Sequence, residues 1–156
     1  MRMRRYKEVL IKGLMMGLML VGLFGFSALA GEEWLTDFNQ AKEEAAEKKL
    51  PILIDFTGSD WCSWCIKLDQ EVFSQNEFKE YAKDHLVLFL ADFPGKRGKK
   101  LAAEVKAQNE QLFKTYDIKG YPTILLLDAS GKVIAQTGYR PGGAGAYVKH
   151  LKGLLK

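Results

Sequence analysis

The only two cysteines of this 156-residue chain lie three positions apart, in Trp61-Cys62-Ser63-Trp64-Cys65. The residues before them, Ile52-Leu53-Ile54-Asp55-Phe56-Thr57, form a mostly apolar run of strand length, and from Cys62 onward the apolar pattern becomes helical. The pair is therefore predicted where a strand passes into a helix. A thiol in the first turn of a helix faces unpaired backbone N–H groups and the positive end of the helix dipole, which stabilise a thiolate. We interpret Cys62 as the more exposed, attacking thiol and Cys65 as the thiol that resolves a mixed disulfide.

Three other uses of this cysteine pair can be compared with redox exchange. A purely structural bridge closes so short a ring that the loop-entropy gain is only about 2 kcal/mol. A zinc site needs four ligands, and the histidines, His85 and His150, have no metal-ligand spacing to the pair. Two thiolates could hold Cu(I), so a copper-binding protein stays open as an alternative. For redox exchange we expect no metal and no cofactor other than the Cys62–Cys65 disulfide itself.

The first thirty residues have the pattern of an export signal. Residues 1–12 carry five basic side chains and one acidic one, residues 13–30 carry no charge, and Ala28-Leu29-Ala30 supplies the small residues of a cleavage site. We predict a secretory signal peptide over residues 1–30, cleaved after Ala30. An uncleaved anchor is the alternative, because an apolar run of this length is near the minimum for a membrane span. Either way residues 31–156 are expected to be periplasmic or secreted, where disulfides persist.

The charge balance excludes one class of partner. The chain has 23 Lys and Arg and 19 Asp and Glu, but the basic excess lies in the leader, and residues 31–156 carry equal numbers of both signs. A neutral domain gives no electrostatic reason to bind nucleic acid or anionic lipid, so membrane contact is expected only through residues 1–30. Residues 94–100 form the one dense basic cluster of residues 31–156, and their role stays open.

Hydrophobic periodicity divides residues 31–156 into helices and strands, with no repeat and no linker. Strands are expected at residues 52–57, 86–91, 122–127 and 133–137, and the last two read as a hairpin. A first helix is expected to run to about Lys48, capped by Thr36 or Asp37. Further helices are expected to begin at a capping box at Ser74, to span residues 101–116 and to lie near the C-terminus.

Two residues outside the cysteine motif fit redox chemistry. Asp55 is a carboxyl within an otherwise apolar strand, where burial raises a pKa, and such a group could accept the proton of Cys65. The alternative is that Asp55 ends the strand and caps a local turn. Pro122 follows Gly120-Tyr121 and opens a strand, a setting that suits a cis peptide, although spacing alone does not choose between cis and trans.

Four segments, taken together and in this order, resemble the thioredoxin superfamily. They are Ile52-Leu53-Ile54-Asp55-Phe56, Trp61-Cys62-Ser63-Trp64-Cys65, Tyr116-Asp117-Ile118-Lys119-Gly120-Tyr121-Pro122-Thr123, and Gly131-Lys132-Val133 ahead of Gly138. The chain is also similar to the C-terminal periplasmic domain of the membrane thiol-disulfide reductase DsbD. For residues 31–156 the resemblance implies an α/β domain with the thioredoxin-like fold, a central mixed β-sheet flanked by helices on both faces.

The resemblance also implies a role for each matching residue. Cys62 corresponds to the attacking cysteine, Cys65 to the resolving one, Asp55 to the buried acid and Pro122 to a cis-proline. Substrate-binding residues are expected around both motifs: Trp61, Ser63, Trp64, Tyr121, Pro122 and Thr123. The family usually has Gly-Pro between its cysteines where this chain has Ser63-Trp64, so the redox potential is not inherited, and residues 94–100 look like an insertion.

These inferences predict an extracytoplasmic thiol-disulfide oxidoreductase that exchanges disulfides with protein substrates, in the reductive direction. A disulfide oxidase or isomerase is the alternative within the same chemistry, because it would use the same residues at a different potential. Continued reduction outside the cytosol needs an electron donor, and a membrane thiol carrier is the candidate. The domain is expected to be a monomer.

Overall fold

The computed structural model describes residues 34–156, so the predicted signal peptide of residues 1–30 lies outside the described residues. The elements follow in chain order: α2 (Phe38–Lys48), β1 (Ile52–Thr57), α3 (Ser63–Leu68), the π-helix η1 (Asp69–Phe73), α4 (Asn76–His85), β2 (Val87–Asp92), α5 (Ala103–Thr115), β3 (Thr123–Leu127), β4 (Val133–Thr137) and α6 (Gly143–Leu154). Between residues 34 and 156 no helix is both long and apolar enough to cross a bilayer.

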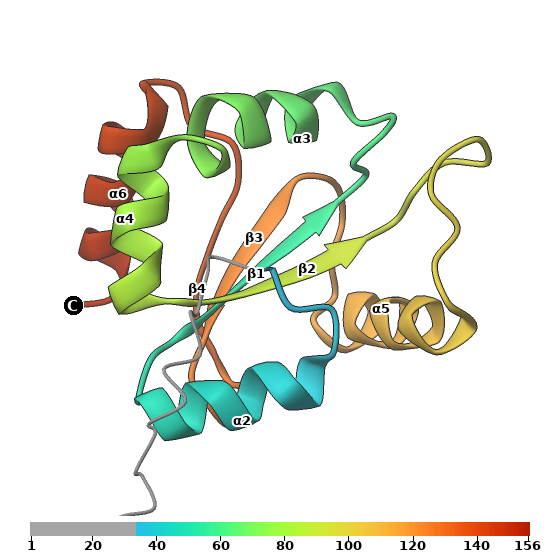
Figure 1. The fold of residues 1–156 in the computed structure, drawn as a ribbon, viewed down its shortest axis with the longest axis horizontal. Coiled ribbons are helices and arrows are strands. Elements are labelled where there is room, and N and C mark those ends of the chain that lie inside the picture. The colour runs from blue at the N-terminus through green and yellow to red at the C-terminus, as the bar shows by residue number, and fades with distance from the viewer. Residues whose placement is uncertain (1–33) are drawn as a thin grey trace, which may run out of the picture.

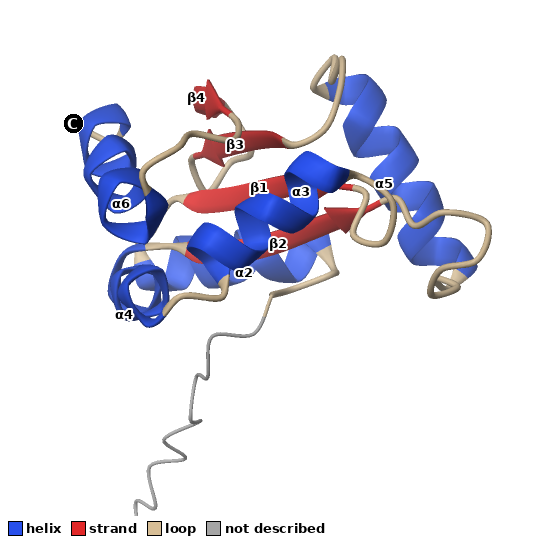
Figure 2. Cartoon of the chain, turned by 90° about the horizontal axis from the view of Figure 1, so that it is seen from above, coloured by secondary structure: helices blue, strands red, loops and turns tan. Residues whose placement is uncertain are grey.

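The four strands form one mixed sheet in the order β2-β1-β3-β4 (Figure 2). β1 runs parallel to β2 and antiparallel to β3, and β3 pairs with β4 as the predicted hairpin. β1 is buried along its whole length, as its apolar sequence predicted, because it lies in the interior of the sheet between two other strands.

Helices cover both faces of the sheet (Figure 1). One face packs Leu53, Leu88 and Leu126 against residues of α3, η1, α4 and α6. The other face packs Ile54 and Phe89 against residues of α2 and α5. The two apolar clusters follow the alternation of side chains along the strands. The predicted fold, a mixed sheet flanked by helices on both faces, is confirmed.

Of the two helix caps predicted from the sequence, the cap of α2 is confirmed and the cap of α4 is wrong. Asp37 caps α2, with its Oδ1 accepting hydrogen bonds from the backbone N–H groups of residues 39 and 40 at 2.8 and 3.1 Å. The capping box expected at Ser74 is wrong. The N-cap of α4 is Gln75 without a side-chain hydrogen bond, and the Ser74 hydroxyl donates instead to Asp69 of η1 at 3.1 Å. Ser74 is the C-cap of the π-helix that continues α3, and its backbone N–H donates to the carbonyls of Asp69 and Val72. The Ser74 side chain therefore lies beside η1 and does not cap α4.

Candidate active site

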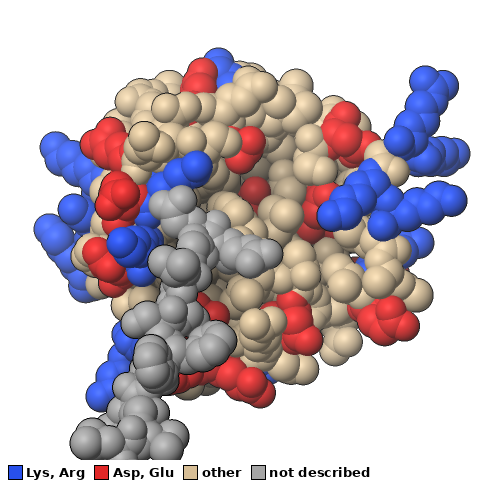
Figure 3. Space-filling view, viewed as in Figure 1, with Lys and Arg blue, Asp and Glu red and all other residues tan. Residues whose placement is uncertain are grey.

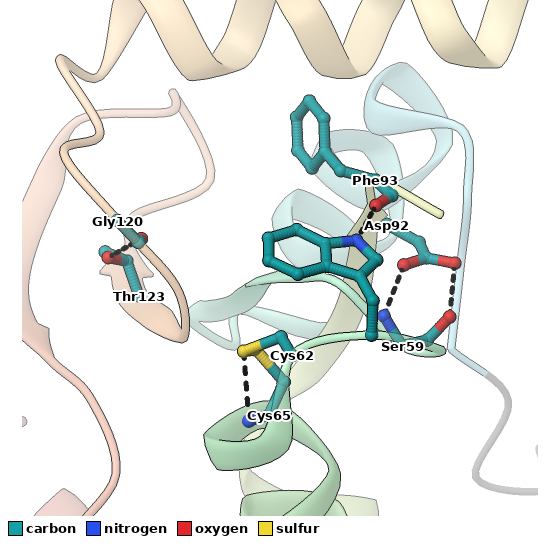
Figure 4. Close-up of a disulfide and its surroundings, with 8 residues drawn as sticks. Ser59, Cys62, Cys65, Asp92, Phe93, Gly120 and Thr123 are labelled. Atoms are coloured by element: carbon teal, nitrogen blue, oxygen red, sulfur yellow. Dashed lines mark hydrogen bonds between the residues drawn. A yellow bond between two sulfur atoms is a disulfide. The ribbon is translucent and has the colours of Figure 1, made fainter. Parts of the chain in front are cut away.

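Cys62 and Cys65 form a disulfide at the N-terminus of α3, with an S–S distance of 2.15 Å (Figure 4). Cys62 is the N-cap of the helix, and its Sγ accepts a hydrogen bond from the backbone N–H of Cys65 at 3.3 Å. The predicted junction of strand and helix is therefore confirmed. In the reduced protein the same N–H group and the helix dipole would stabilise a thiolate on Cys62. Both cysteines are buried, and Cys62 is slightly the more exposed of the two.

The turn that leads from β1 to Cys62 is held by a buried carboxylate at the end of β2. Asp92 accepts hydrogen bonds from the backbone N–H of Ser59 at 3.0 Å and from its hydroxyl at 2.7 Å (Figure 4). The side-chain amide of Asn109, on α5, in turn donates to the backbone carbonyl of Asp92 at 3.0 Å. The sequence predicted a turn at residues 58–60, but it gave no sign of a partner 33 positions further on.

Trp61 lies half-exposed beside the disulfide, with 54% of its surface open to solvent. Its indole N–H donates to the backbone carbonyl of Phe93 at 2.7 Å. Its ring meets the ring of Tyr121 edge-on, with 5.6 Å between centroids. The indole is thus fixed between the end of β2 and the loop that carries Pro122.

Gly58 makes room for this indole. A Cβ atom at position 58 would lie 2.5 Å from the Trp61 ring, closer than real Cβ contacts. We expect Gly58→Ala to push the indole off the Phe93 carbonyl and to lower the free energy of unfolding by about 1–3 kcal/mol. Urea unfolding followed by tryptophan fluorescence measures the change.

Gly120→Ala is the matched control for this prediction, because a Cβ at position 120 meets nothing within 4 Å. An effect of Gly58→Ala no larger than that of Gly120→Ala would contradict the close packing of Trp61 on Gly58.

Trp64 lies against a different set of neighbours. Its ring packs on Tyr139 at a centroid distance of 5.1 Å, and the Lys67 Nζ lies 5.3 Å from both rings. The Tyr139 hydroxyl donates to a carboxylate oxygen of Glu71 at 2.7 Å, and Lys67 forms an ion pair with Glu71 at 3.8 Å. This cluster holds the second residue between the cysteines while leaving 54% of Trp64 exposed.

The Tyr121–Pro122 peptide bond is cis, which confirms the isomer that the resemblance implied. Tyr121 joins this loop to the cysteine motif through its packing on Trp61. Thr123 is buried and its hydroxyl donates to the Gly120 carbonyl at 2.7 Å, so a contact of Thr123 with a substrate would come from its backbone (Figure 4). Ser63 is exposed at the start of α3.

Asp55 lies in the middle of the sheet, paired with Leu90 of β2 and Ile124 of β3. The alternative that it ends the strand and caps a turn is therefore wrong. Burial, reinforced by the charges of Asp69 and Asp92, raises the pKa of Asp55 to about 8 from 3.8. Its Oδ1 is buried and has no hydrogen-bond partner among the described residues.

The direction of the Asp55 side chain follows from the alternation along β1. Asp55 shares a face with Leu53, and Leu53 packs in the cluster that contains residues of α3, η1 and α6. The carboxyl therefore lies on the face of the sheet that the cysteine-bearing helix covers.

Several residues that shape this site were not predicted from the sequence. They include Ser59, Asp92, Asn109, Lys67, Glu71 and Tyr139. Lys67 and Glu71 have the helical spacing of an ion pair, which could have been noticed. The other contacts join distant parts of the chain and have no local signal.

A model of the thioredoxin-like domain family matches residues 38–149. A curated relative, the disulfide bond reductase DsbH of Chlamydia pneumoniae, is 38% identical over 129 residues, which cover 83% of this chain and 76% of the relative. This chain belongs to the thioredoxin-like family. The disulfide at the start of α3, in a member of this family, makes the chain a thiol-disulfide oxidoreductase.

Two further comparisons support this assignment. A solved structure described as DsbH oxidoreductase superposes with a TM-score of 0.74 at 36% identity, over 79% of this chain and 83% of that one. The thiol:disulfide interchange protein DsbD of Campylobacter jejuni (strain RM1221) is 23% identical over an alignment of 149 positions that covers 84% of this chain but only 24% of that protein. The predicted membership of the thioredoxin superfamily is confirmed.

Proposed function

We propose that this chain reduces disulfides of extracytoplasmic proteins. The observation that carries the proposal is the capping position of Cys62, whose Sγ receives the Cys65 N–H at the start of α3, in a chain similar to a disulfide bond reductase. A sulfur atom in this position is the better leaving group and the more easily ionised thiol of the pair. The export pattern of residues 1–30 supports a location outside the cytoplasm.

The reaction begins with the Cys62 thiolate. It attacks one sulfur of the substrate disulfide, a mixed disulfide forms, and the other substrate sulfur leaves as a thiolate. The Cys65 thiol then loses its proton and attacks the Cys62 Sγ, which releases the second substrate thiolate and closes the Cys62–Cys65 disulfide. Two electrons pass from the protein to the substrate, and the disulfide seen in the structure is the product state.

We assign the acceptance of the Cys65 proton to Asp55. The carboxyl lies on the face of the sheet that α3 covers, and its Oδ1 is buried with no partner in the described chain. Burial raises its pKa to about 8, so the carboxyl is ionised in about a tenth of the molecules at pH 7, and in that form it is a base strong enough to accept a thiol proton. Asp55 would then return the proton as the product leaves.

The substrate surface is proposed around the disulfide. Trp61 and Trp64 are the two exposed large side chains next to the cysteines, and Ser63 is exposed between them. Tyr121 and Pro122 form the neighbouring loop through the packing of Tyr121 on Trp61. Backbone atoms of Pro122 and Thr123 would bind the extended substrate chain next to the attacked sulfur.

Repeated turnover requires that the Cys62–Cys65 disulfide be reduced again. A membrane thiol carrier is the proposed electron donor, since it can bring electrons from the cytosol to a protein that lies outside it. The similarity to DsbD, a thiol:disulfide interchange protein, supports a place in the same kind of thiol exchange.

Reduction of insulin disulfides by dithiothreitol tests the proposed direction. We expect this protein to accelerate the precipitation of the freed insulin chain over dithiothreitol alone. The reverse assay starts from the oxidised protein and a reduced, unfolded protein with paired cysteines. Rapid oxidation of that protein without acceleration of insulin reduction would favour an oxidase and contradict the proposal. Retention of Cu(I) against a moderate chelator, with neither activity, would favour the copper-binding alternative.

A further inference from the structure

The basic segment, residues 94–100, is fixed next to the cysteine motif although it lies more than thirty positions further along the chain. The backbone N–H of Gly95 donates to the Asp60 carboxylate at 2.8 Å. Gly98 packs so closely on the same carboxylate that a Cβ there would lie 2.0 Å from an Asp60 oxygen. The indole N–H of Trp61 donates to the backbone carbonyl of Phe93, one residue before the segment. The two residues that precede Cys62 therefore hold the basic segment in place.

All charged side chains of the basic segment are positive and exposed. They are Lys96, Arg97, Lys99 and Lys100. None of them takes part in the ion pairs found within residues 34–156. Asp60, the acid that holds the segment, already accepts a hydrogen bond from its backbone. Figure 3 shows Lys and Arg side chains projecting from the edge of the molecule where the segment lies.

This concentration of charge is local. Residues 31–156 are neutral overall, so the domain has no general attraction for acidic molecules. A hollow of about 380 Å³ lies between the basic segment and α5. Its lining includes Phe93 and Leu101 with Lys96, Lys99 and Lys100, and two acidic residues that already have partners: Glu110 pairs with Lys106, and Asp92 binds Ser59. Apolar and cationic groups side by side suit an acidic polypeptide better than a bare anion. Charges of one sign beside a reactive group mainly raise the rate at which an oppositely charged partner associates.

We propose that the basic segment is a docking surface for acidic regions of the disulfide-bearing protein substrates. The proposal rests on the proposed reductase function and adds the charge class of its substrates. A substrate bound by the segment lies next to Trp61 and Cys62, because Asp60 and Trp61 hold the segment there. An anionic lipid bound at the segment would bring no disulfide to Cys62, whereas an acidic protein would. The place of the segment next to the cysteines therefore favours a protein substrate.

Disulfide exchange with three synthetic peptides tests the docking surface. The peptides share one disulfide-closed ring and differ only in flanking Glu, Gln or Lys residues. With reduced protein at low ionic strength, we expect the Glu peptide to react fastest and the Lys peptide slowest. Neutralising the segment (K96Q, R97Q, K99Q and K100Q together) is expected to slow the Glu peptide about tenfold and the Gln peptide less than twofold. Added salt should slow the Glu peptide in the unaltered protein and have little effect on it in the variant.

The matched control removes four positive charges from α4, α6 and the C-terminus instead: K79Q, K83Q, K149Q and K156Q. We expect it to slow the Glu peptide less than twofold. Equal slowing by the two variants, or no preference for the Glu peptide in the unaltered protein, would overturn the docking surface. Reduction of the Gln peptide depends on the reductase function and not on charged docking. If the Gln peptide is reduced but the rates of the three peptides do not depend on their charge, the docking surface is rejected and the proposed function stands.

Two further readouts complete the test. The salt dependence of the unaltered protein needs no variant, and it decides the question if the fourfold variant fails to fold. Binding to phosphatidylglycerol vesicles that disappears in the fourfold variant, with unchanged peptide rates, would assign the basic segment to a membrane surface and overturn the proposal.

Discussion

Cys62→Ser is expected to lower the rate of disulfide exchange by more than about 10³-fold, to the level of the uncatalysed reaction. A serine hydroxyl at the N-cap of α3 can accept the Cys65 N–H as the sulfur does, so the fold should persist while the nucleophile is lost. Ser130→Ala is the matched control, because Ser130 is exposed in the turn between β3 and β4, at the end of the sheet opposite the cysteines. Comparable losses in the two variants would contradict the assignment of Cys62 as the attacking residue.

Cys65→Ser is expected to have a different effect, because it removes only the resolving step. Cys62 should still attack, and the mixed disulfide with the substrate should accumulate instead of turning over. Non-reducing electrophoresis and mass spectrometry of the purified adducts measure the outcome. If adducts form on the Cys62→Ser variant and not on Cys65→Ser, the two roles are exchanged.

Asp55→Asn is expected to slow the resolving step by about 10²-fold near neutral pH, because an amide cannot accept the Cys65 proton. The first attack by Cys62 should change much less, since the N-terminus of α3 supplies its stabilisation. Stopped-flow measurement separates the formation of the mixed disulfide from its decay. Asp84→Asn is the control, because Asp84 is an exposed carboxyl on α4. Equal slowing of both steps would indicate a structural role for Asp55.

The buried carboxyl also gives a pH dependence of stability with a definite sign. The pKa of Asp55 is about 8 in the folded, oxidised protein and 3.8 when unfolded, so between these values only the folded state holds the proton. The contribution of Asp55 to the free energy of unfolding is therefore fully present below about pH 4. It is lost as the pH rises from about 4 to about 8, and it does not change further above about pH 8.

Urea unfolding of the oxidised protein at about pH 5 and about pH 8 measures this contribution. We expect the loss of stability between the two conditions to be clearly smaller in Asp55→Asn than in the unaltered protein. The Asp84→Asn variant should keep the full difference. An unchanged difference in Asp55→Asn would mean that the carboxyl is ionised in the folded protein at both pH values.

Much of the fold could be predicted because the local signals agree with one another. The apolar run of β1 and the alternation of helices and strands each match the elements found. The cysteine pair and Asp55 were also found from the sequence, because a reactive thiol and a buried acid need residue types that stand out from their surroundings. The roles of these residues remain predictions that the variants above test.

The rest of the site depends on contacts that no local pattern encodes. Asp92 holds Ser59 across 33 positions, and Tyr139 reaches Trp64 and Glu71 from the end of β4. The basic segment was recognised as a charged loop, but its attachment to Asp60 became visible only in the folded chain. The failed capping box at Ser74 has the same cause, since the continuation of α3 into a π-helix redirects that hydroxyl.

The reduction potential of the Cys62–Cys65 couple, measured by equilibration with known ratios of reduced and oxidised glutathione or dithiothreitol, tests the reductase assignment most directly. A difference of about 30 mV changes the equilibrium by only about 1.4 kcal/mol, so Ser63 and Trp64 between the cysteines can decide the direction. We expect a value near that of thioredoxin, about −270 mV. A value near about −120 mV, typical of a strong periplasmic oxidant, would contradict the account and make the protein a donor of disulfides.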